Sequence, residues 1–419
     1  MGKRIALLTY GTRGDIEPFL ALAVALGRVG YQPRLAGPRP FQALAAAQGI
    51  PFVGLDGDPA AVSAALTDRA GLNPLAMLRF MSAYLYPLAE SVLQQAERAC
   101  LDSDAIIHSF LMTYAGHHLA VEGGIPDLSA QFFPVFSPTA AYPAPVFPDW
   151  PLGPAYRRLS HRLVTSAFRM GSEFLYRRLR RSRPSMPNLH RWNVDRQGRI
   201  EIPLLLAYSP QLVPPPAELA ASARVTGYWV MEEEADWVPD AELAAFLGEG
   251  PEPVYVGFGS MSSSKHEHRL RACLDTARQL DLRVVLAAGP GFPLPDALPD
   301  SVHRVQDVPH RWLFPRMSAV VHHGGAGTTG GAARAGVPQL VIPFSADQGF
   351  WGRRAEIAGI APPPIPLRRL SASTFRQALD GALHTAGLRA RAAFLGEAIR
   401  SEHGTEQAIE LIRQVIGPP

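Results

Sequence analysis

The chain has 419 residues, which is more than one ordinary hydrophobic core holds, so two domains are expected. Its 40 Lys and Arg residues nearly balance 37 Asp and Glu, and 47% of the residues are hydrophobic. This composition excludes a disordered chain and a basic protein that coats nucleic acid. Cys100 and Cys273 form no metal or redox motif, and the sequence shows no signal-peptide pattern and no apolar run of about 20 residues. We therefore expect a soluble, cytoplasmic protein.

The N-terminal half alternates predicted strands with predicted helices. Residues 3–10, KRIALLTY, indicate a buried strand, and residues 17–30 indicate an apolar-faced helix that ends at Gly30. Further short apolar runs occur at PRLAG, DAIIHSF and DLSAQFFP. This alternation favours a parallel, doubly wound sheet, so the first half is interpreted as a Rossmann-like domain.

The second half repeats this alternation. Its predicted strands lie in PVYVGFGS, LRVVLAAGP, SAVVHHGG and PQLVIPF, with helices such as HEHRLRACLDTARQLD between them. We therefore expect an α/β protein of two Rossmann-like domains that face each other across a cleft. In such proteins ligands bind at the carboxyl ends of the strands.

Three consecutive prolines, Pro214–Pro216, place the connection between the domains. The predicted organisation is an N-terminal domain at residues 1–213, a linker at 214–225, a C-terminal domain at 226–391 and a helical segment at 392–419. That segment is expected to pack back on the N-terminal domain, and the proline-rich connection is compatible with hinge motion.

The stretch VVHHGGAGTTGG carries the clearest chemical signal. Its glycines Gly324, Gly325 and Gly327 predict a tight turn with exposed N–H groups, and Thr328 and Thr329 are expected to cap the helix that follows. A helix N-terminus of this kind favours a phosphate group, to which His323 can add a donor. The preceding His322 is interpreted as structural.

Asp347 and Gln348 follow the next predicted strand and therefore lie near the same cleft. A carboxylate beside a carboxamide suits hydroxyl groups, and together with a diphosphate site the pair indicates a nucleotide sugar. A solvated loop acid stays open as the alternative for Asp347.

Three segments resemble the family 1 glycosyltransferases of the GT-B fold. The first is PHRWLFPRMSAVVHHGGAGTTGGAARAGVPQLVIPFSADQGFWGRR, and GTRGDIEPFLALA and VTGYW extend the resemblance over most of the chain. The pattern is most similar to sterol glucosyltransferases and to glycosyltransferases of antibiotic and macrolide aglycones. The resemblance implies a UDP-sugar donor, UDP-glucose by preference, in the C-terminal domain and an acceptor in the N-terminal domain. It also implies inversion at the anomeric carbon, no metal and no further cofactor.

The resemblance also assigns donor-binding residues. Those it implies are Ser260, Val308, His323, Gly325, Ala326, Gly327, Thr328, Asp347 and Gln348. Thr12 and Arg13 are expected to approach the donor phosphates, although Arg13 is equally able to brace Asp15.

Asp15, in GTRGD, is the candidate general base, because transfer to an acceptor requires a group that takes the hydroxyl proton. An aspartate directly before a helical segment is also a favoured N-cap, which stabilises a helix by about 1 kcal/mol relative to alanine. The two roles are compatible.

The acceptor side is predicted from an aromatic, proline-rich stretch after residue 131. The expected acceptor-binding residues are His108, Phe132, Phe133, Phe136 and Tyr142. They suit an apolar pocket for a flat, hydrophobic aglycone, with an ordinary core as the alternative. Residues 156–186 then place arginines beside apolar side chains at helical spacing, which predicts either a solvated helix face or peripheral contact with an anionic membrane.

The sequence thus predicts a metal-independent, inverting enzyme that moves a hexose from a nucleotide diphosphate to a hydroxyl of a lipophilic acceptor such as a sterol. A transferase that uses a dTDP-deoxysugar to tailor a polyketide or peptide antibiotic stays open. So do a nucleotide-sugar epimerase and a non-catalytic nucleotide-sugar binding protein. The oligomeric state is not predicted.

Overall fold

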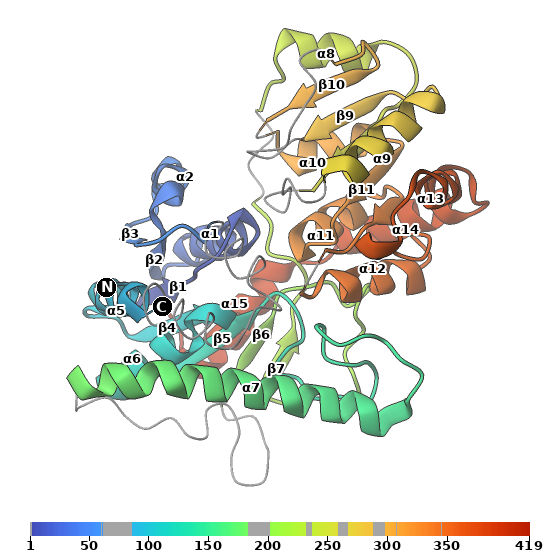
Figure 1. The fold of residues 1–419 in the computed structure, drawn as a ribbon. Coiled ribbons are helices and arrows are strands. Elements are labelled where there is room, and N and C mark those ends of the chain that lie inside the picture. Colours follow the sequence, from blue (N-terminus) through green and yellow to red (C-terminus); the bar gives the residue numbers. More distant parts are fainter. Residues whose placement is uncertain are drawn as a thin grey trace.

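A computed structural model describes residues 2–59, 61, 86–182, 202–231, 237–258, 267–287, 298–306, 308–344 and 346–419. These residues form two α/β units, each built on a parallel sheet (Figure 1). The predicted architecture of two Rossmann-like domains is confirmed.

The N-terminal sheet has seven strands in the order β3-β2-β1-β4-β5-β6-β7. Their bounds are β1 Arg4–Leu8, β2 Gln32–Pro38, β3 Phe52–Leu55, β4 Ala105–Ser109, β5 Asp127–Gln131, β6 Leu204–Leu206 and β7 Ala223–Val225. All pairings are parallel. Since β1 lies between β2 and β4, the strand order reverses beside it, and the loop after β1 opens at the position where α/β proteins bind ligands.

Helices cover both faces of this sheet. They are α1 Arg13–Arg28, α2 Gln42–Ala47, α5 Tyr86–Cys100, α6 Thr113–Gly123 and α7 Gly153–Ser182, with short 3-10 turns at Arg39–Phe41 and Phe110–Met112. The helix α1 buries its apolar face, including Phe19 and Leu22, as the spacing of its apolar residues predicts. The long helix α7 runs along the outside of the domain (Figure 1).

The C-terminal sheet has five strands in the order β10-β9-β8-β11-β12. Their bounds are β8 Val254–Gly257, β9 Val284–Ala287, β10 Val302–Val305, β11 Ala319–His322 and β12 Gln339–Val341. The helices are α8 Ala241–Gly248, α9 Glu267–Gln279, α10 His310–Leu313, α11 Ala326–Ala335, α12 Gln348–Ile357, α13 Ala372–His384, α14 Leu388–Arg400 and α15 Gly404–Ile416, with 3-10 turns at Phe314–Arg316 and Leu367–Arg369. Because β8 and β11 are neighbours at the reversal of strand order, the loop after β11 opens at the corresponding position of this sheet.

The two sheets are joined differently from the predicted organisation. The strand β7 lies inside the predicted linker 214–225 and pairs with β6, so the N-terminal sheet extends to Val225. The helix α14 begins at Leu388 and packs on α11 of the C-terminal unit. The helix α15 crosses back, where Ile409 and Ile412 join the core that contains Phe19 of α1.

A second core is shared by the two units. It contains Tyr142 and Tyr208 of the N-terminal unit together with Phe350 and Trp351 of α12. The ring centroids of Tyr208 and Trp351 lie 6.1 Å apart, and those of Tyr142 and Phe350 lie 5.5 Å apart. Buried aromatic contacts therefore fix the seam between the units. Among the described helices, none combines the length and the hydrophobicity needed to cross a bilayer.

The packing of α14 on α11 predicts a specific glycine requirement. A Cβ atom at Gly396 would lie 2.6 Å from the Cα atom of Gly336, which is backbone and has little room to shift. We expect Gly396→Ala to lower the free energy of unfolding by roughly 1–3 kcal/mol. The matched control is Gly171→Ala in α7, where the new methyl group meets open space and alanine should stabilise the helix by up to about 1 kcal/mol. Equal effects of the two substitutions in urea unfolding would contradict this packing.

Candidate active site

The candidate site lies where one helix from each unit begins. The helix α1 starts directly after the β1 loop, and α11 starts directly after the β11 loop. A Cβ atom at Gly327 would lie only 3.8 Å from the Cα atom of Gly14, so the first turns of the two helices meet across the seam. Each first turn presents unpaired N–H groups and a partial positive charge. Their convergence forms an environment suited to a diphosphate.

The first turn of α11 differs from the predicted cap. Gly325 is the N-cap residue, while Thr328 and Thr329 lie inside the helix, which begins at Ala326. A Cβ atom at Gly325 would lie 2.6 Å from the Nε2 atom of His323. Glycine is therefore needed here because it lets the imidazole lie against the turn.

His323 is placed to interact with an anion at this turn. Its Nδ1 atom is buried and has no hydrogen-bond partner among the described residues. Desolvation lowers the pKa of His323 to about 4, so the imidazole is neutral at physiological pH. A neutral imidazole still offers one N–H group that can donate to a phosphate oxygen.

His322 has a structural role, as interpreted from the sequence. It is fully buried, its Nε2 atom lies 2.9 Å from the Oε1 atom of Gln339, and the N–H of Gly324 donates to its Nδ1 atom at 3.0 Å. Both ring nitrogens are thereby satisfied. His322 fixes the entry of the chain into the glycine turn.

His310 is a site residue that sequence reasoning missed. It begins α10, stacks on Phe314 with ring centroids 4.3 Å apart, and lies 3.4 Å from the hydroxyl oxygen of Tyr255. Burial, with smaller contributions from the positive charge of Arg13 and from the neighbouring His323, lowers its pKa to about 4. His310 therefore faces the same space as residues from both units. The available signal was its position directly after a proline in the PHRWLF segment.

Asp15 lies at the third position of α1, and Thr12, not Asp15, is the N-cap residue. The backbone N–H of Thr12 donates to the Oδ2 atom of Asp15 at 2.8 Å, which completes a capping box. A Cβ atom at Gly11 would lie 2.2 Å from the same carboxylate oxygen, so only glycine fits there. The geometry gives Asp15 a helix-capping contact while its carboxylate stays at the seam.

The environment of Asp15 favours its protonated form. Its pKa is raised from 3.8 to about 6, mainly by burial and with a smaller contribution from the negative charge of Asp347, against the lowering effect of the N–H of Thr12. The contribution of Asp347 shows that carboxylates from the two units lie near each other. Arg13 pairs with Glu17, one turn further along α1.

Asp347 and Gln348 stand at the start of α12, as predicted for the end of the preceding strand. The indole N–H of Trp351 donates to the Oδ2 atom of Asp347 at 2.8 Å, and the N–H of Phe344 donates to the Oε1 atom of Gln348 at 2.7 Å. Burial raises the pKa of Asp347. Both side chains are thus held in place, which suits the orientation of sugar hydroxyl groups.

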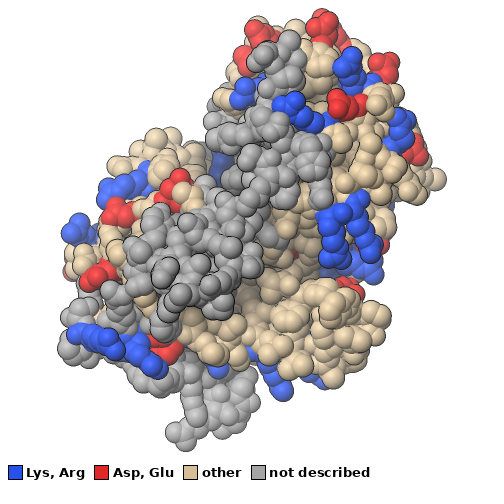
Figure 2. All heavy atoms as spheres, in the orientation of Figure 1, with Lys and Arg blue, Asp and Glu red and all other residues tan. Residues whose placement is uncertain are grey.

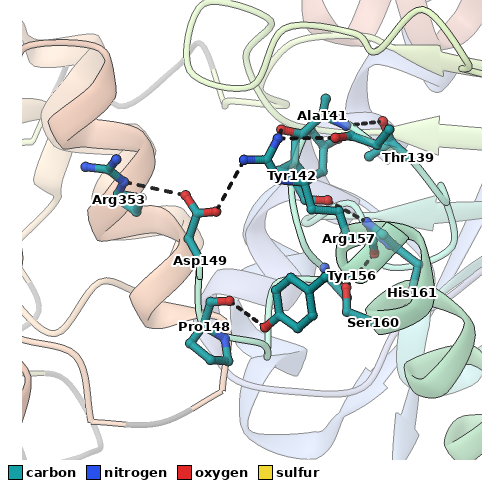
Figure 3. Close-up of polar contacts among 12 residues, drawn as sticks. Thr139, Ala141, Tyr142, Pro148, Asp149, Tyr156, Arg157, Ser160, His161 and Arg353 are labelled. Carbon is teal, nitrogen blue, oxygen red and sulfur yellow. Dashed lines mark hydrogen bonds and ion pairs between the residues drawn. The ribbon is translucent and has the colours of Figure 1, made fainter. Parts of the chain in front are cut away.

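The residue that holds the Asp347 side chain, Trp351, also packs on the N-terminal unit. Trp351 is fully buried and packs on Tyr208. On the outer side of α12, Arg353 lies 3.6 Å from Asp149, which also faces Arg157 at 3.9 Å (Figure 3). The loop before α7 therefore contacts the helix that carries the candidate sugar-binding pair.

The predicted acceptor residues have different surroundings. His108 is fully buried, and its Nε2 atom lies 2.9 Å from the Oδ2 atom of Asp127. Phe132 packs on Phe19 in the core beneath α1, with ring centroids 5.8 Å apart. Phe132 thus belongs to the hydrophobic core, and His108 is a buried polar residue that contacts Asp127.

Of the other three predicted acceptor residues, Tyr142 has a ring contact with the C-terminal unit. Phe133 and Phe136 contact Phe110, each with ring centroids 5.4 Å apart, and Tyr142 packs on Phe350.

Of the predicted donor residues, Val308 lies half-buried just before α10, whereas Ser260 falls outside the described residues. Within the described part of the chain, no group of three or more His, Cys, Asp or Glu residues has the arrangement of a metal site.

The Trp351 contact predicts a selective loss of sugar binding. Trp351→Phe removes the N–H donor to Asp347, so the affinity for UDP-glucose, the donor that the sequence resemblance implies, should fall about tenfold while that for UDP stays unchanged. Titration calorimetry with both ligands measures this difference. The matched control is Trp229→Phe, which removes another buried indole donor, the one to Thr226, and should alter neither affinity. An equal loss for UDP and UDP-glucose would contradict the positioning of Asp347 by Trp351.

Comparisons with known proteins agree with this geometry. Residues 5–141 match the glycosyltransferase family 28 N-terminal domain, and residues 271–413 match the erythromycin biosynthesis protein CIII-like C-terminal domain. A sterol 3-beta-glucosyltransferase of Emericella nidulans is 35% identical over 98% of this chain. The chain spans 30% of the length of that relative.

Solved structures show the same fold. The calicheamicin glycosyltransferase CalG4 aligns with a TM-score of 0.71 at 19% identity, over 100% of this chain and 99% of CalG4. The glycosyltransferase VinC, solved in complex with dTDP, aligns with a TM-score of 0.65 at 19% identity, over 98% of each chain. With both halves matched in order and the fold shared, the chain belongs to the family 1 glycosyltransferases of the GT-B fold.

Proposed function

We propose that this chain transfers glucose from UDP-glucose to a hydroxyl group of a sterol-like, lipophilic acceptor, with inversion and without a metal ion. The observation that carries the proposal is the Asp15 carboxylate, which has a raised pKa and lies at the meeting of the α1 and α11 N-termini. The sterol 3-beta-glucosyltransferase relatives support the acceptor class, and glucose follows from their name.

The converging helix ends stabilise the leaving group in this proposal. When the bond between the anomeric carbon and the diphosphate breaks, negative charge develops on a phosphate oxygen. N–H groups of the α11 turn and the neutral imidazole of His323 are preorganised donors for that charge. Because these donors are already fixed by the fold, little reorganisation accompanies the reaction.

Asp15 activates the acceptor. Its carboxylate accepts the hydroxyl proton while the acceptor oxygen attacks the anomeric carbon on the face opposite the departing UDP. One carbon–oxygen bond forms as the other breaks, so the configuration is inverted and the proton remains on Asp15. A pKa of about 6 makes this carboxylate a stronger base than an ordinary aspartate, while it stays ionised at neutral pH.

Asp347 and Gln348 orient the sugar. They stand at the start of α12, which lies against the glycine turn before α11. A Cβ atom at Gly324 of that turn would lie 2.7 Å from the carbonyl oxygen of Gln348. A donor with dTDP and a deoxysugar is the second candidate, favoured by the structural neighbour that holds dTDP. A thermal-shift comparison of UDP, dTDP and GDP with their sugar conjugates separates the two donors.

Asp15→Asn tests the catalytic role. The variant should lose at least about 100-fold in kcat with unchanged UDP affinity, because the amide cannot accept the proton. In the wild type, kcat/KM should fall as the pH drops through about 6, since protonation removes the base. Steady-state assays with UDP-glucose and a sterol acceptor measure both. Retention of most of the turnover would contradict the role of Asp15, and sugar conversion without an acceptor would indicate an epimerase.

Stability provides the control for this variant. Because the pKa of Asp15 is raised in the folded state, the native protein binds this proton more tightly than the unfolded chain does. The stability that protonated Asp15 contributes is therefore lost as the pH rises from about 4 to 6, and the Asn variant lacks this contribution to the pH dependence. Asp15→Asn should unfold at a higher temperature than the wild type above pH ~7, with no difference near pH ~4. A variant destabilised at every pH would instead have lost its fold.

A further inference from the structure

One face of α7 carries a continuous exposed stripe. Leu159, Leu163, Met170, Arg177 and Arg181 follow one another at spacings of four, seven, seven and four residues, which keeps them on one side of a helix. Leu159, Leu163 and Met170 are 52%, 49% and 74% exposed. We call these five residues the α7 stripe.

The opposite side of α7 is anchored to the protein. Tyr176 and Phe168 pack on Tyr114, with ring centroids 5.3 and 5.7 Å apart, and Leu179 is buried. These contacts set the rotation of the helix, so the α7 stripe points away from the domain. The helix lies along the outer edge of the molecule (Figure 1).

The apolar surface continues beyond the start of α7. Trp150 and Leu152 are 56% and 59% exposed, and Trp150 stacks on Tyr156 with ring centroids 6.0 Å apart. Figure 2 shows a broad area without charged side chains at this end of the molecule. An exposed tryptophan beside aliphatic side chains is typical of protein surfaces that contact the interfacial region of a bilayer.

The charge of α7 is strongly one-sided. Its sequence contains eight arginines and one glutamate, and the glutamate, Glu173, pairs with Arg180. Arg162, Arg177 and Arg181 have no ion-pair partner among the described residues. Arg177 and Arg181 are exposed and add two positive charges to the α7 stripe, which favours an anionic partner.

We propose that the α7 stripe, together with Trp150 and Leu152, docks on the surface of a bilayer that contains anionic lipids. The apolar side chains would enter the interfacial region while the arginines bind lipid phosphates. A second copy of this chain is a poorer occupant, because a symmetric contact would bring two arginine-rich faces together. This proposal does not depend on the donor or the acceptor of the transfer reaction.

Vesicle co-sedimentation of the full chain tests the proposal. The wild type should sediment with vesicles of phosphatidylcholine containing about one-third phosphatidylserine, and much less with pure phosphatidylcholine. Each arginine near such a surface strengthens partitioning about fivefold, so Arg177→Glu/Arg181→Glu should lower it by at least about 30-fold. Leu163→Ser/Met170→Ser should also reduce binding, and raised salt should weaken it.

Matched controls use residues of the same kinds elsewhere on the surface. Arg368→Glu/Arg369→Glu changes two exposed arginines of the C-terminal unit, and Phe394→Ser removes a side chain that is 64% exposed. Both controls should bind vesicles like the wild type, and all variants should keep the wild-type unfolding temperature. The proposal is overturned if the wild type does not sediment with anionic vesicles, if stripe and control variants bind equally, or if light scattering shows that the stripe variants dissociate a dimer.

Discussion

The site depends on the close approach of two helix N-termini across the seam between the units. A Cβ atom at Gly327 would lie 3.8 Å from the Cα atom of Gly14, so the first turns of α1 and α11 are in van der Waals contact. The positive ends of the two helices then face one space. The negative charge of Asp347 also contributes to the raised pKa of Asp15. In the proposed function, anion binding and proton abstraction both depend on this one arrangement.

The seam itself is maintained by packing away from the chemistry. Trp351 of α12 contacts both units. Its ring packs on Tyr208 of the N-terminal unit, and its indole N–H donates to Asp347. On the other side of the molecule, α15 returns to α1 and buries Ile409 and Ile412. Any change in the angle between the units would have to disturb one of these contacts, so the geometry of the site and the packing of the seam are coupled.

Local pattern was sufficient to predict the parts of the site that follow directly from one strand and one helix. The glycine turn at Gly324–Gly327 and the pair Asp347–Gln348 are of this kind. The cap of α1 was predicted less well, because Asp15 is compatible with both the N-cap and the third helical position. His310 was missed because its role depends on Arg13 and His323, which only the fold brings near. For His108 and Phe132 the sequence left a pocket and a buried core position open, and the structure shows both side chains to be buried.

The central claim is that Asp15 and Asp347, from different units, share one electrostatic environment. The most direct test is carbon-13 NMR of aspartate side-chain carboxyl groups, with the Asp15 resonance assigned through a variant, in the wild type and in Asp347→Asn. The structure predicts a pKa of about 6 for Asp15 in the wild type and a lower pKa once Asp347 is neutralised. A pKa near the ordinary value of 3.8, unaffected by Asp347→Asn, would contradict the arrangement.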